Sequence, residues 1–235
     1  MSIPGIEVQL GSEHRLRPLH NYKVIAFDMD STLINIECID ELADMVGCKE
    51  EVAAITKAVM RGEITDFKES LRQRVALLKD ASTSHMQEVY ETRLRLNPGA
   101  LELVKACKAV GMYVILVSGG FTFFANRVQE LLGIDFVRAN ELAIESGLLT
   151  GRLVDQPWGD VCDGEEKKKA LLQACERLRV DLGDTIAVGD GANDLPMMSV
   201  CGLSCAYHAK PKVREQAMVS INEGGLDRLL EVLPV

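Results

Sequence analysis

Two pairs of aspartates stand out among the residues that could do chemistry. Asp28 and Asp30 follow the apolar run VIAF at residues 24–27, and Asp190 and Asp194 lie in the glycine-rich segment GDGAND. Two carboxylates only two residues apart cannot both stay ionised cheaply in a low-dielectric pocket, unless a cation joins them or one takes a proton. All the candidate ligands are hard oxygens, which favour magnesium over zinc. The pattern therefore predicts a magnesium site.

A second set of residues could receive an anion. Ser118, Gly119 and Gly120 follow another apolar run. Glycines there and in GDGAND let backbone N–H groups approach a negative charge, and the serine hydroxyl adds a donor. One of the three consecutive lysines at 167–169 could turn into the same site, although a lysine chosen at random from such a run more often lies on a solvated face.

The elements that must position these residues can be recognised from three short β-rich apolar runs, which are KVIAF at 23–27, YVILV at 113–117 and TIAV at 185–188. Such continuous runs are typical of parallel strands that are buried on both faces. Helical patterns separate them; one is expected to open at Asn97 and Pro98 and to end at Gly111. The alternation predicts an α/β fold with a Rossmann-like, three-layer parallel sheet.

In such a sheet, ligands bind beyond the carboxyl ends of the strands, so the polar segments that follow the three runs are expected to meet there. Strand alternation also predicts that the Met29 side chain points away from the reaction. Asp28 and Asp30 would then lie on one side of the strand.

About eighty residues separate the first two strands, far more than a single crossover helix needs. The stretch contains three apolar stripes at helical spacing, which are Ile36, Ile39, Ala43 and Val46; Val52, Ile55 and Val59; and Phe67, Leu71, Val75 and Leu78. We therefore expect an inserted small helical-bundle cap. The predicted organisation is an irregular leader at 1–22, a core at 23–34 and 96–235 with a β-hairpin near 138–155, and a cap at 35–95.

Composition restricts the class of protein. A chain of 235 residues with a formal net charge of −9 has no broad basic face for nucleic acid or for an anionic membrane. The first twenty-two residues contain no apolar segment of the kind that a signal peptide or membrane helix requires. Seven cysteines without a CxxC pair do not indicate a disulfide framework. We expect a cytoplasmic protein that acts on a small molecule, either as a monomer or as a homodimer.

The segments DMDST, VSGGF, the lysine and GDGAND, in this order, resemble the haloacid-dehalogenase superfamily of aspartate-nucleophile phosphatases, from about residue 22 to the end. The longer strings FDMDSTLINIECIDELA, SLRQRVALLKD, VSGGFTFFANRV and VGDGANDLPMM are similar to the phosphoserine phosphatases of that superfamily, in the cap as well as in the core. The resemblance implies a magnesium-dependent hydrolase that converts O-phospho-L-serine to L-serine and phosphate, the last step of serine biosynthesis.

The resemblance also implies roles for the acidic residues. Asp28 is the implied nucleophile, which forms an aspartyl phosphate, and Asp30 is the implied general acid and then general base. Magnesium would be held by the carboxylates of Asp28 and Asp190 and by the backbone carbonyl of Asp30. Asp194 would orient the waters of the metal, or the lysine, from outside the ligand set.

Further residues are implied to bind substrate. Lys167 suits the family spacing to GDGAND, with Lys168 as the fallback, and Lys167 would take the phosphoryl oxygens together with Ser118, Gly119 and Gly120. Asn193 would contact substrate or phosphate through its amide.

Specificity is implied to lie in the cap. Arg74 sits within the apolar stripe of Phe67, and from the pattern alone it either snorkels to solvent or is buried against an anion. The resemblance favours a bidentate pair with the serine carboxylate, and it makes Glu37 the partner of the serine ammonium. Helical periodicity places Glu37 on a polar face. The segment MRGEITDF is one residue longer than is usual in the family, so the resemblance does not decide whether Met60 and Phe67 form pocket walls.

Two alternatives remain open from the sequence. One is a related capped phosphatase or phosphotransferase that acts on another small phosphate ester, which would share the core and differ in the cap. The other is a non-catalytic phosphate-binding module on the same fold, against which the complete set of Asp28, Asp30, Lys167 and Asp190 argues.

Overall fold

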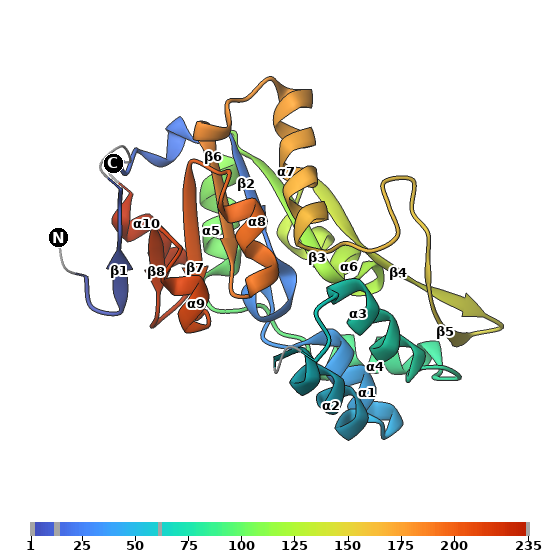
Figure 1. Cartoon of the computed structure of the whole chain (residues 1–235). Helices are drawn as coiled ribbons and strands as arrows, with labels where there is room; N and C mark the ends of the chain where they lie inside the picture. Colours follow the sequence, from blue (N-terminus) through green and yellow to red (C-terminus); the bar gives the residue numbers. More distant parts are fainter. Residues whose placement is uncertain (1–2, 12–14, 61–62, 234–235) are drawn as a thin grey trace.

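The computed structural model describes residues 3–11, 15–60 and 63–233 of the chain, and its centre is one eight-stranded sheet (Figure 1). The strand order is β1-β8-β7-β6-β2-β3-β4-β5. The strands from β8 to β4 in this order are parallel, whereas the edge strands β1 and β5 run antiparallel to their neighbours. The bounds are β1 Ile6–Val8, β2 Val24–Phe27, β3 Tyr113–Phe121, β4 Phe136–Glu145, β5 Leu148–Val154, β6 Thr185–Gly189, β7 Leu203–Tyr207 and β8 Val219–Ile221.

Helices cover both faces of the sheet, and every residue of β2 is therefore buried. Ile25 and Phe27 join the apolar cluster on the side of α5 and α6, and Val24 and Ala26 join the cluster on the side of α7 and α8. This alternation of side chains is what a strand packed on both faces requires. The bounds are α5 Ala100–Ala109, α6 Thr122–Leu132, α7 Gly164–Leu178, α8 Leu195–Met198, α9 Pro211–Arg214 and α10 Leu229–Val232. The predicted three-layer α/β class is confirmed.

Among the described residues, four helices lie between β2 and α5, where the sequence predicts the insertion. They are α1 Cys38–Val46, α2 Lys49–Met60, α3 Phe67–Ala76 and α4 Thr83–Thr92, and we call them the helical insert. The chain enters and leaves the insert at one place, where Asn35 and Arg95 exchange hydrogen bonds of 3.0 and 2.7 Å. Figure 1 shows the four helices gathered beyond one end of the sheet, beside β5.

The β4–β5 hairpin supports the insert from the core. The two strands are antiparallel and turn at Ser146 and Gly147, in the segment where the sequence predicts a hairpin. The hairpin bonds to the chain between α3 and α4, because the Asp80 N–H donates to the Leu149 carbonyl at 2.8 Å and the Thr83 N–H donates to the Gly147 carbonyl at 2.9 Å. The insert is therefore attached both at its entry point and at the hairpin.

The predicted irregular leader is corrected by β1, which pairs with β8 from Ile6↔Ile221 to Val8↔Val219. Without β1, β8 would be the edge of the sheet, and its outer backbone N–H and C=O groups would lack hydrogen-bond partners. β1 provides these partners. Ile6 is buried by this pairing, while Val8 is partly exposed. Three residues with one inward side chain carry too little pattern to be recognised as a strand.

The predicted helix start at Asn97 and Pro98 is also corrected. Helix α5 begins at Ala100 after Gly99, whose φ of 76° places it in the left-handed region that glycine adopts without strain. The Asn97 side chain is used elsewhere, because its amide donates to the carbonyls of Thr32 and Ile34 at 2.8 and 2.9 Å. Asn97 therefore ties the start of α5 to the loop that follows β2.

Two further features concern the cysteines and the character of the helices. All seven cysteines are free thiols, and every one except Cys48 is buried. Within the described ranges, none of the helices combines the length and the apolar character that a membrane crossing would need.

Candidate active site

The chain turns sharply at the carboxyl end of β2. Strand β2 ends at Phe27, and residues Met29–Leu33 form a tight turn in which Asp30 has extended angles and Ser31 a φ of 57°. Met29 is fully buried, whereas Asp28 and Asp30 both line one cavity of about 520 Å³. Asp28 and Asp30 thus lie on one side, as expected. The reason differs from the expected one, because a turn and not strand alternation places both at the cavity. Strand alternation does not apply at Asp30, because β2 ends at Phe27.

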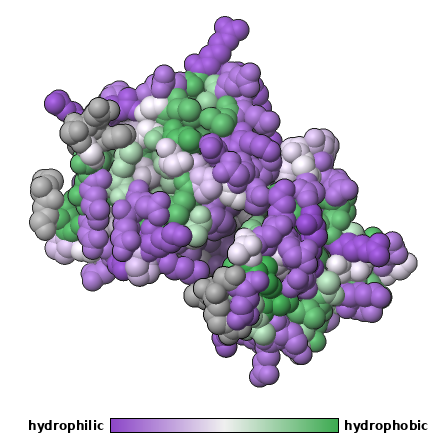
Figure 2. All heavy atoms as spheres, in the orientation of Figure 1, coloured by the Kyte–Doolittle hydropathy of each residue, from purple (hydrophilic) through white to green (hydrophobic). Residues whose placement is uncertain are grey.

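This cavity lies between the carboxyl ends of the central strands and the helical insert. Figure 2 shows the two parts of the molecule meeting at a notch, with hydrophilic residues over much of the visible face. The core contributes the carboxyl-terminal part of β3 and the segments after β2 and β6, as the strand-end rule predicts. The predicted residues that line the cavity are Asp28, Asp30, Glu37, Arg74, Ser118, Gly119, Gly120, Asp190 and Asn193.

Lys167 lies directly behind Asp28 and is not itself among the residues that line the cavity. Its ammonium is fully buried and donates to Asp28 Oδ1 at 2.6 Å and to Asp194 Oδ1 at 2.7 Å. Its two neighbours point elsewhere: Lys168 lies 3.8 Å from Glu165, and Lys169 is well exposed. Helix α7 turns by about 100° per residue, so only one of three consecutive lysines can face the strand ends.

The site carries more negative charge than its lysine can balance. Burial, followed by the charge of Asp194, raises the pKa of Asp28 well above its ordinary value. Burial and Asp194 likewise raise the pKa of Asp190 to about 7. Burial alone would lower the pKa of Lys167, but Asp194 and Asp28 raise it, so this lysine stays charged. Three carboxylates around one ammonium leave a surplus that a divalent cation would neutralise.

The carboxylates of Asp28, Asp190 and Asp194 could hold such a cation, because one oxygen from each lies within 4.8 Å of the others. Asp194 is already engaged through both oxygens. Oδ1 accepts from Lys167, and Oδ2 accepts from the backbone N–H groups of Asp190 and Gly191 at 3.1 and 3.0 Å. Asp194 therefore fits a supporting position better than a direct ligand position, and the hard-oxygen donor set fits a magnesium-like ion.

Asp30 lies in a different environment from Asp28. Its Oδ1 accepts from the Cys38 thiol at 3.1 Å, and its Oδ2 accepts from the Cys38 N–H at 3.4 Å. Burial, and next the charge of Glu37, raises the pKa of Asp30 to about 8. A carboxyl group with this pKa holds its proton near neutral pH, which suits a proton donor.

The carboxyl-terminal part of β3 approaches these acids closely. Ser118 is buried, and its hydroxyl accepts from the Gly120 N–H at 2.9 Å. A Cβ on Gly120 would stand 2.9 Å from Asp30 Oδ2, and a Cβ on Gly119 would stand 3.2 Å from the Phe67 ring. A side chain at either position would therefore displace a neighbouring side chain, that of Asp30 or that of Phe67, and glycine avoids this.

The helical insert supplies the opposite wall of the cavity. Arg74 is half-buried and lines the cavity with Phe67 and Leu71, so the structure decides against a side chain that snorkels to open solvent. Burial lowers the pKa of the Arg74 guanidinium, while the charges of Asp40 and Glu37 oppose that shift. The side chain of Met60, the other predicted wall, lies outside the described residues.

Glu37 differs from its prediction in one respect. It precedes α1 instead of lying on the polar face of the helix, and its Oε1 accepts from the Ser31 hydroxyl at 2.6 Å. The sequence reasoning missed two more charged residues of the cavity, Asp40 and Lys210. Asp40 stands one helical turn after Glu37, and Lys210 follows β7, so the strand-end rule would have found Lys210 if that strand had been recognised.

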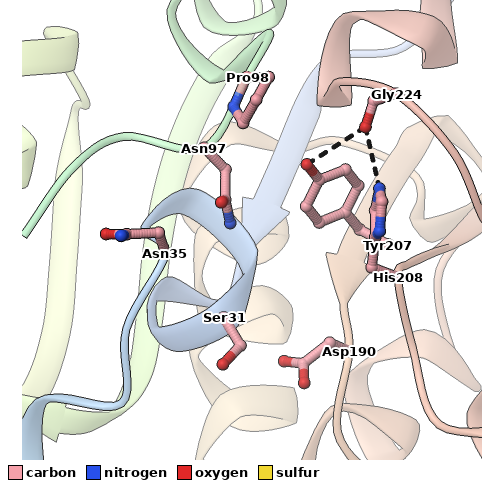
Figure 3. A pocket seen from close by; sticks show the side chains of 8 residues that line it. All are labelled: Ser31, Asn35, Asn97, Pro98, Asp190, Tyr207, His208 and Gly224. Atoms are coloured by element: carbon pink, nitrogen blue, oxygen red, sulfur yellow. Dashed lines mark hydrogen bonds between the residues drawn. The ribbon is translucent and has the colours of Figure 1, made fainter.

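A second hollow of about 360 Å³ lies behind the turn and shares Ser31 and Asp190 with the main cavity (Figure 3). Tyr207 and His208 both point to the Gly224 carbonyl, with distances of 3.4 and 2.9 Å from Tyr207 Oη and His208 Nε2. These polar groups are therefore bonded within the protein. We assign the chemistry to the main cavity, where acids, the lysine and the glycine loop meet.

Comparison with known proteins shows the family of the chain. A family model described as haloacid dehalogenase-like hydrolase matches residues 25–199. The chain is 66% identical over 230 residues to the phosphoserine phosphatase of Polaromonas sp. (strain JS666 / ATCC BAA-500), a match that covers 98% of this chain and 97% of the relative.

Two solved structures are similar over 91% of this chain and 99% of theirs. One is described as a phospho-aspartyl intermediate analogue of phosphoserine phosphatase, with a TM-score of 0.82 and 40% identity. The other is a substrate-bound phosphoserine phosphatase complex, with a TM-score of 0.82 and 39% identity.

Proposed function

Since this chain belongs to the haloacid dehalogenase-like hydrolases, we propose that it hydrolyses O-phospho-L-serine to L-serine and inorganic phosphate, the last step of serine biosynthesis. It is a phosphomonoester hydrolase, like the phosphoserine phosphatases to which it is similar over nearly its whole length. The observation that supports the choice of substrate is one cavity with Asp28 on the core side, backed by the buried Lys167, and with Arg74 on the insert side. A phosphate group would meet the first pair and a carboxylate would meet the arginine.

In the first step, an Asp28 carboxylate oxygen attacks phosphorus. The bond between phosphorus and the serine oxygen breaks, and an aspartyl phosphate forms on Asp28. Asp30 donates its proton to the departing serine oxygen, a role supported by its raised pKa. Lys167, Ser118 and the backbone of Gly119 and Gly120 bind the phosphoryl oxygens while charge moves between attacking and leaving groups.

In the second step, Asp30 accepts a proton from the water that attacks phosphorus. The bond between phosphorus and the Asp28 oxygen breaks, phosphate leaves, and both aspartates return to their starting states. The helical insert above the cavity excludes other water from the reacting atoms.

A magnesium ion would be held by Asp28, Asp190 and the backbone carbonyl of Asp30. It would supply a Lewis acid that neutralises the phosphoryl oxygens. Asp194, with its oxygens on Lys167 and on two backbone N–H groups, keeps the lysine and the loop after β6 in place.

The serine end of the substrate would be recognised by charge. Arg74 offers a planar pair of donors to the carboxylate, and Glu37 accepts from the ammonium. Asn193, which also lines the cavity, would contact the substrate through its amide.

Replacing Arg74 by alanine tests both the activity and the substrate. We expect the Michaelis constant for O-phospho-L-serine to rise about 10- to 100-fold, because a charge-assisted hydrogen-bonded pair is lost. The constant for p-nitrophenyl phosphate, which has no carboxylate, should not change. Phosphate release measures both. Arg72→Ala is the matched control, since Arg72 lies on the same helix but pairs with Asp160 at the surface. An unchanged constant for O-phospho-L-serine would favour a phosphatase or phosphotransferase for another ester.

Magnesium should stabilise the protein in a pH-dependent way. In the metal-free protein the pKa of Asp190 is raised to about 7, whereas an unfolded aspartate titrates at about 4. The folded state therefore holds a proton that the unfolded state releases, so the free energy of unfolding falls as pH rises between these two values.

A cation that binds the carboxylate removes this loss. The difference in melting temperature between magnesium and EDTA should consequently grow from pH 5 to pH 8, and phosphate release should stop in EDTA. A melting difference that is constant over this pH range would contradict the proposed role of Asp190.

A further inference from the structure

The phosphate-binding segment Ser118–Gly120 is a bulge within the last part of β3. Val117 pairs with Arg138 and Phe121 pairs with Asn140, so the three residues 118–120 stand opposite a single residue of β4. A bulge of this kind leaves backbone groups without a ladder partner. The Asn140 side chain compensates, because its Nδ2 donates to the Gly119 carbonyl at 2.8 Å. Asn140 is 1% exposed, so this bond is formed away from solvent.

The other end of the same amide reaches a second segment. Asn140 Oδ1 accepts from the Cys162 N–H at 2.8 Å. Cys162 immediately precedes Asp163, whose side chain caps α7 and whose carbonyl accepts from the Lys167 N–H at 2.9 Å. A single buried side chain therefore joins the glycine loop to the start of the helix that carries the lysine.

We propose that Asn140 is a positioning residue for the phosphate end of the site. It does not touch substrate; it keeps the Gly119 peptide and the start of α7 in register, so that loop and lysine bind the same phosphoryl group. This inference rests on the proposed function for the identity of the anion. Small displacements of such groups are costly, since a shift of about 1 Å can reduce a rate about 100-fold.

Helix α7 is also attached to β4 by contacts that do not involve Asn140. The effect of Asn140 on the position of the site can therefore be distinguished from an effect on folding. Arg138 and Glu166 form a buried ion pair of 2.6 Å, and Arg138 also donates to Gln173 at 2.9 Å. Loss of Asn140 therefore leaves the helix attached to the strand. What it removes is the link between the helix start and the loop at Gly119.

The experiment is an Asn140→Ala substitution, with inorganic phosphate and L-serine titrated separately in the presence of magnesium. We expect the affinity for phosphate and the turnover number each to fall about 10- to 100-fold, as for other supporting residues of binding groups. The affinity for L-serine should stay within about twofold, because Arg74 and Glu37 do not depend on the bulge.

Ser204→Ala is the matched control. Ser204 is also buried and its hydroxyl also accepts from a backbone N–H, that of Met218 at 3.0 Å, but it does not line the cavity. Both substitutions should lower the melting temperature, and only Asn140→Ala should weaken phosphate. The proposal is overturned if Asn140→Ala binds phosphate like the unmodified protein, or if it loses phosphate and L-serine to the same extent.

Amide hydrogen exchange on the unmodified protein gives an answer even if the variant does not fold. Phosphate should slow exchange at the Cys162 N–H together with the N–H groups of Gly119 and Gly120. Protection of the glycines with no change at Cys162 would overturn the coupling. Failure of the unmodified protein to hydrolyse O-phospho-L-serine would refute the proposed function instead, since the phosphate titrations do not depend on that substrate.

Discussion

Asp28→Asn is expected to reduce phosphate release by about 10⁴-fold or more, because the amide cannot act as the nucleophile and no covalent intermediate can form. The fold should survive the change. Asp28 is buried beside Asp190 and Asp194, and these like charges raise its pKa. Removing one charge relieves that repulsion, so the melting temperature of the metal-free variant should equal or exceed that of the unmodified protein.

The measurements are steady-state phosphate release, thermal unfolding in EDTA, and mass spectrometry of the protein quenched during turnover. The unmodified protein should gain the mass of one phosphoryl group, and the variant should not. Asp184→Asn is a suitable control, because Asp184 is partly exposed and pairs with Arg17 at the opposite end of β6. Normal activity in Asp28→Asn would refute the assignment of the nucleophile.

Lys167→Met should lose both stability and activity. Removing the ammonium leaves Asp28 and Asp194 buried without their cation, and loss of one partner of a buried pair costs about 3–5 kcal/mol. The catalytic efficiency should also fall by about 10³-fold, since a donor to the phosphoryl oxygens is gone where charge develops. Denaturant unfolding and phosphate release measure the two effects.

The neighbouring lysines provide the controls for this prediction. Lys168→Met and Lys169→Met change the same residue type in the same helical turn. Lys168 pairs at the surface with Glu165. Lys169 has an exposed side chain, and its partner Glu166 keeps its ion pair with Arg138 when Lys169 is replaced. Surface ion pairs contribute about 0–1 kcal/mol, so both variants should keep near-normal stability and activity. A Lys168→Met variant as impaired as Lys167→Met would show that the lysine has been assigned wrongly.

Much of the core could be predicted from the sequence because its signals are local. The apolar runs that became β2, β3 and β6 are continuous and end in polar residues, and that pattern alone indicates buried parallel strands. Strands β1, β7 and β8 were not recognised. β1 and β8 have only three residues each, and β7, with the sequence LSCAY, contains no β-branched residue. β1 forms only because β8 offers it an unpaired edge, which is a non-local condition.

The chemistry of the site was likewise determined by residue types. Carboxylates and glycines at strand ends, with a lysine in the first turns of a helix, provide groups that bind a cation and an anion where such ends meet. Their convergence depends on tertiary structure: the turn after Phe27, with its positive φ at Ser31, brings Asp30 to the cavity, and the register of α7 selects Lys167. Asn140 carried no signal at all, because its role comes from a bulge in a neighbouring strand.

The sequence by itself thus determined the class of fold and the chemical groups, since both follow from patterns within a few residues. Only the tertiary structure decided which side of a helix faces the site, whether Arg74 is buried, and which buried amide joins the two phosphate-binding segments. These depend on contacts between residues far apart in the chain, such as Asn140 with Gly119 and Cys162. Local pattern does not encode such pairings, because they are set by how strands pair and helices pack.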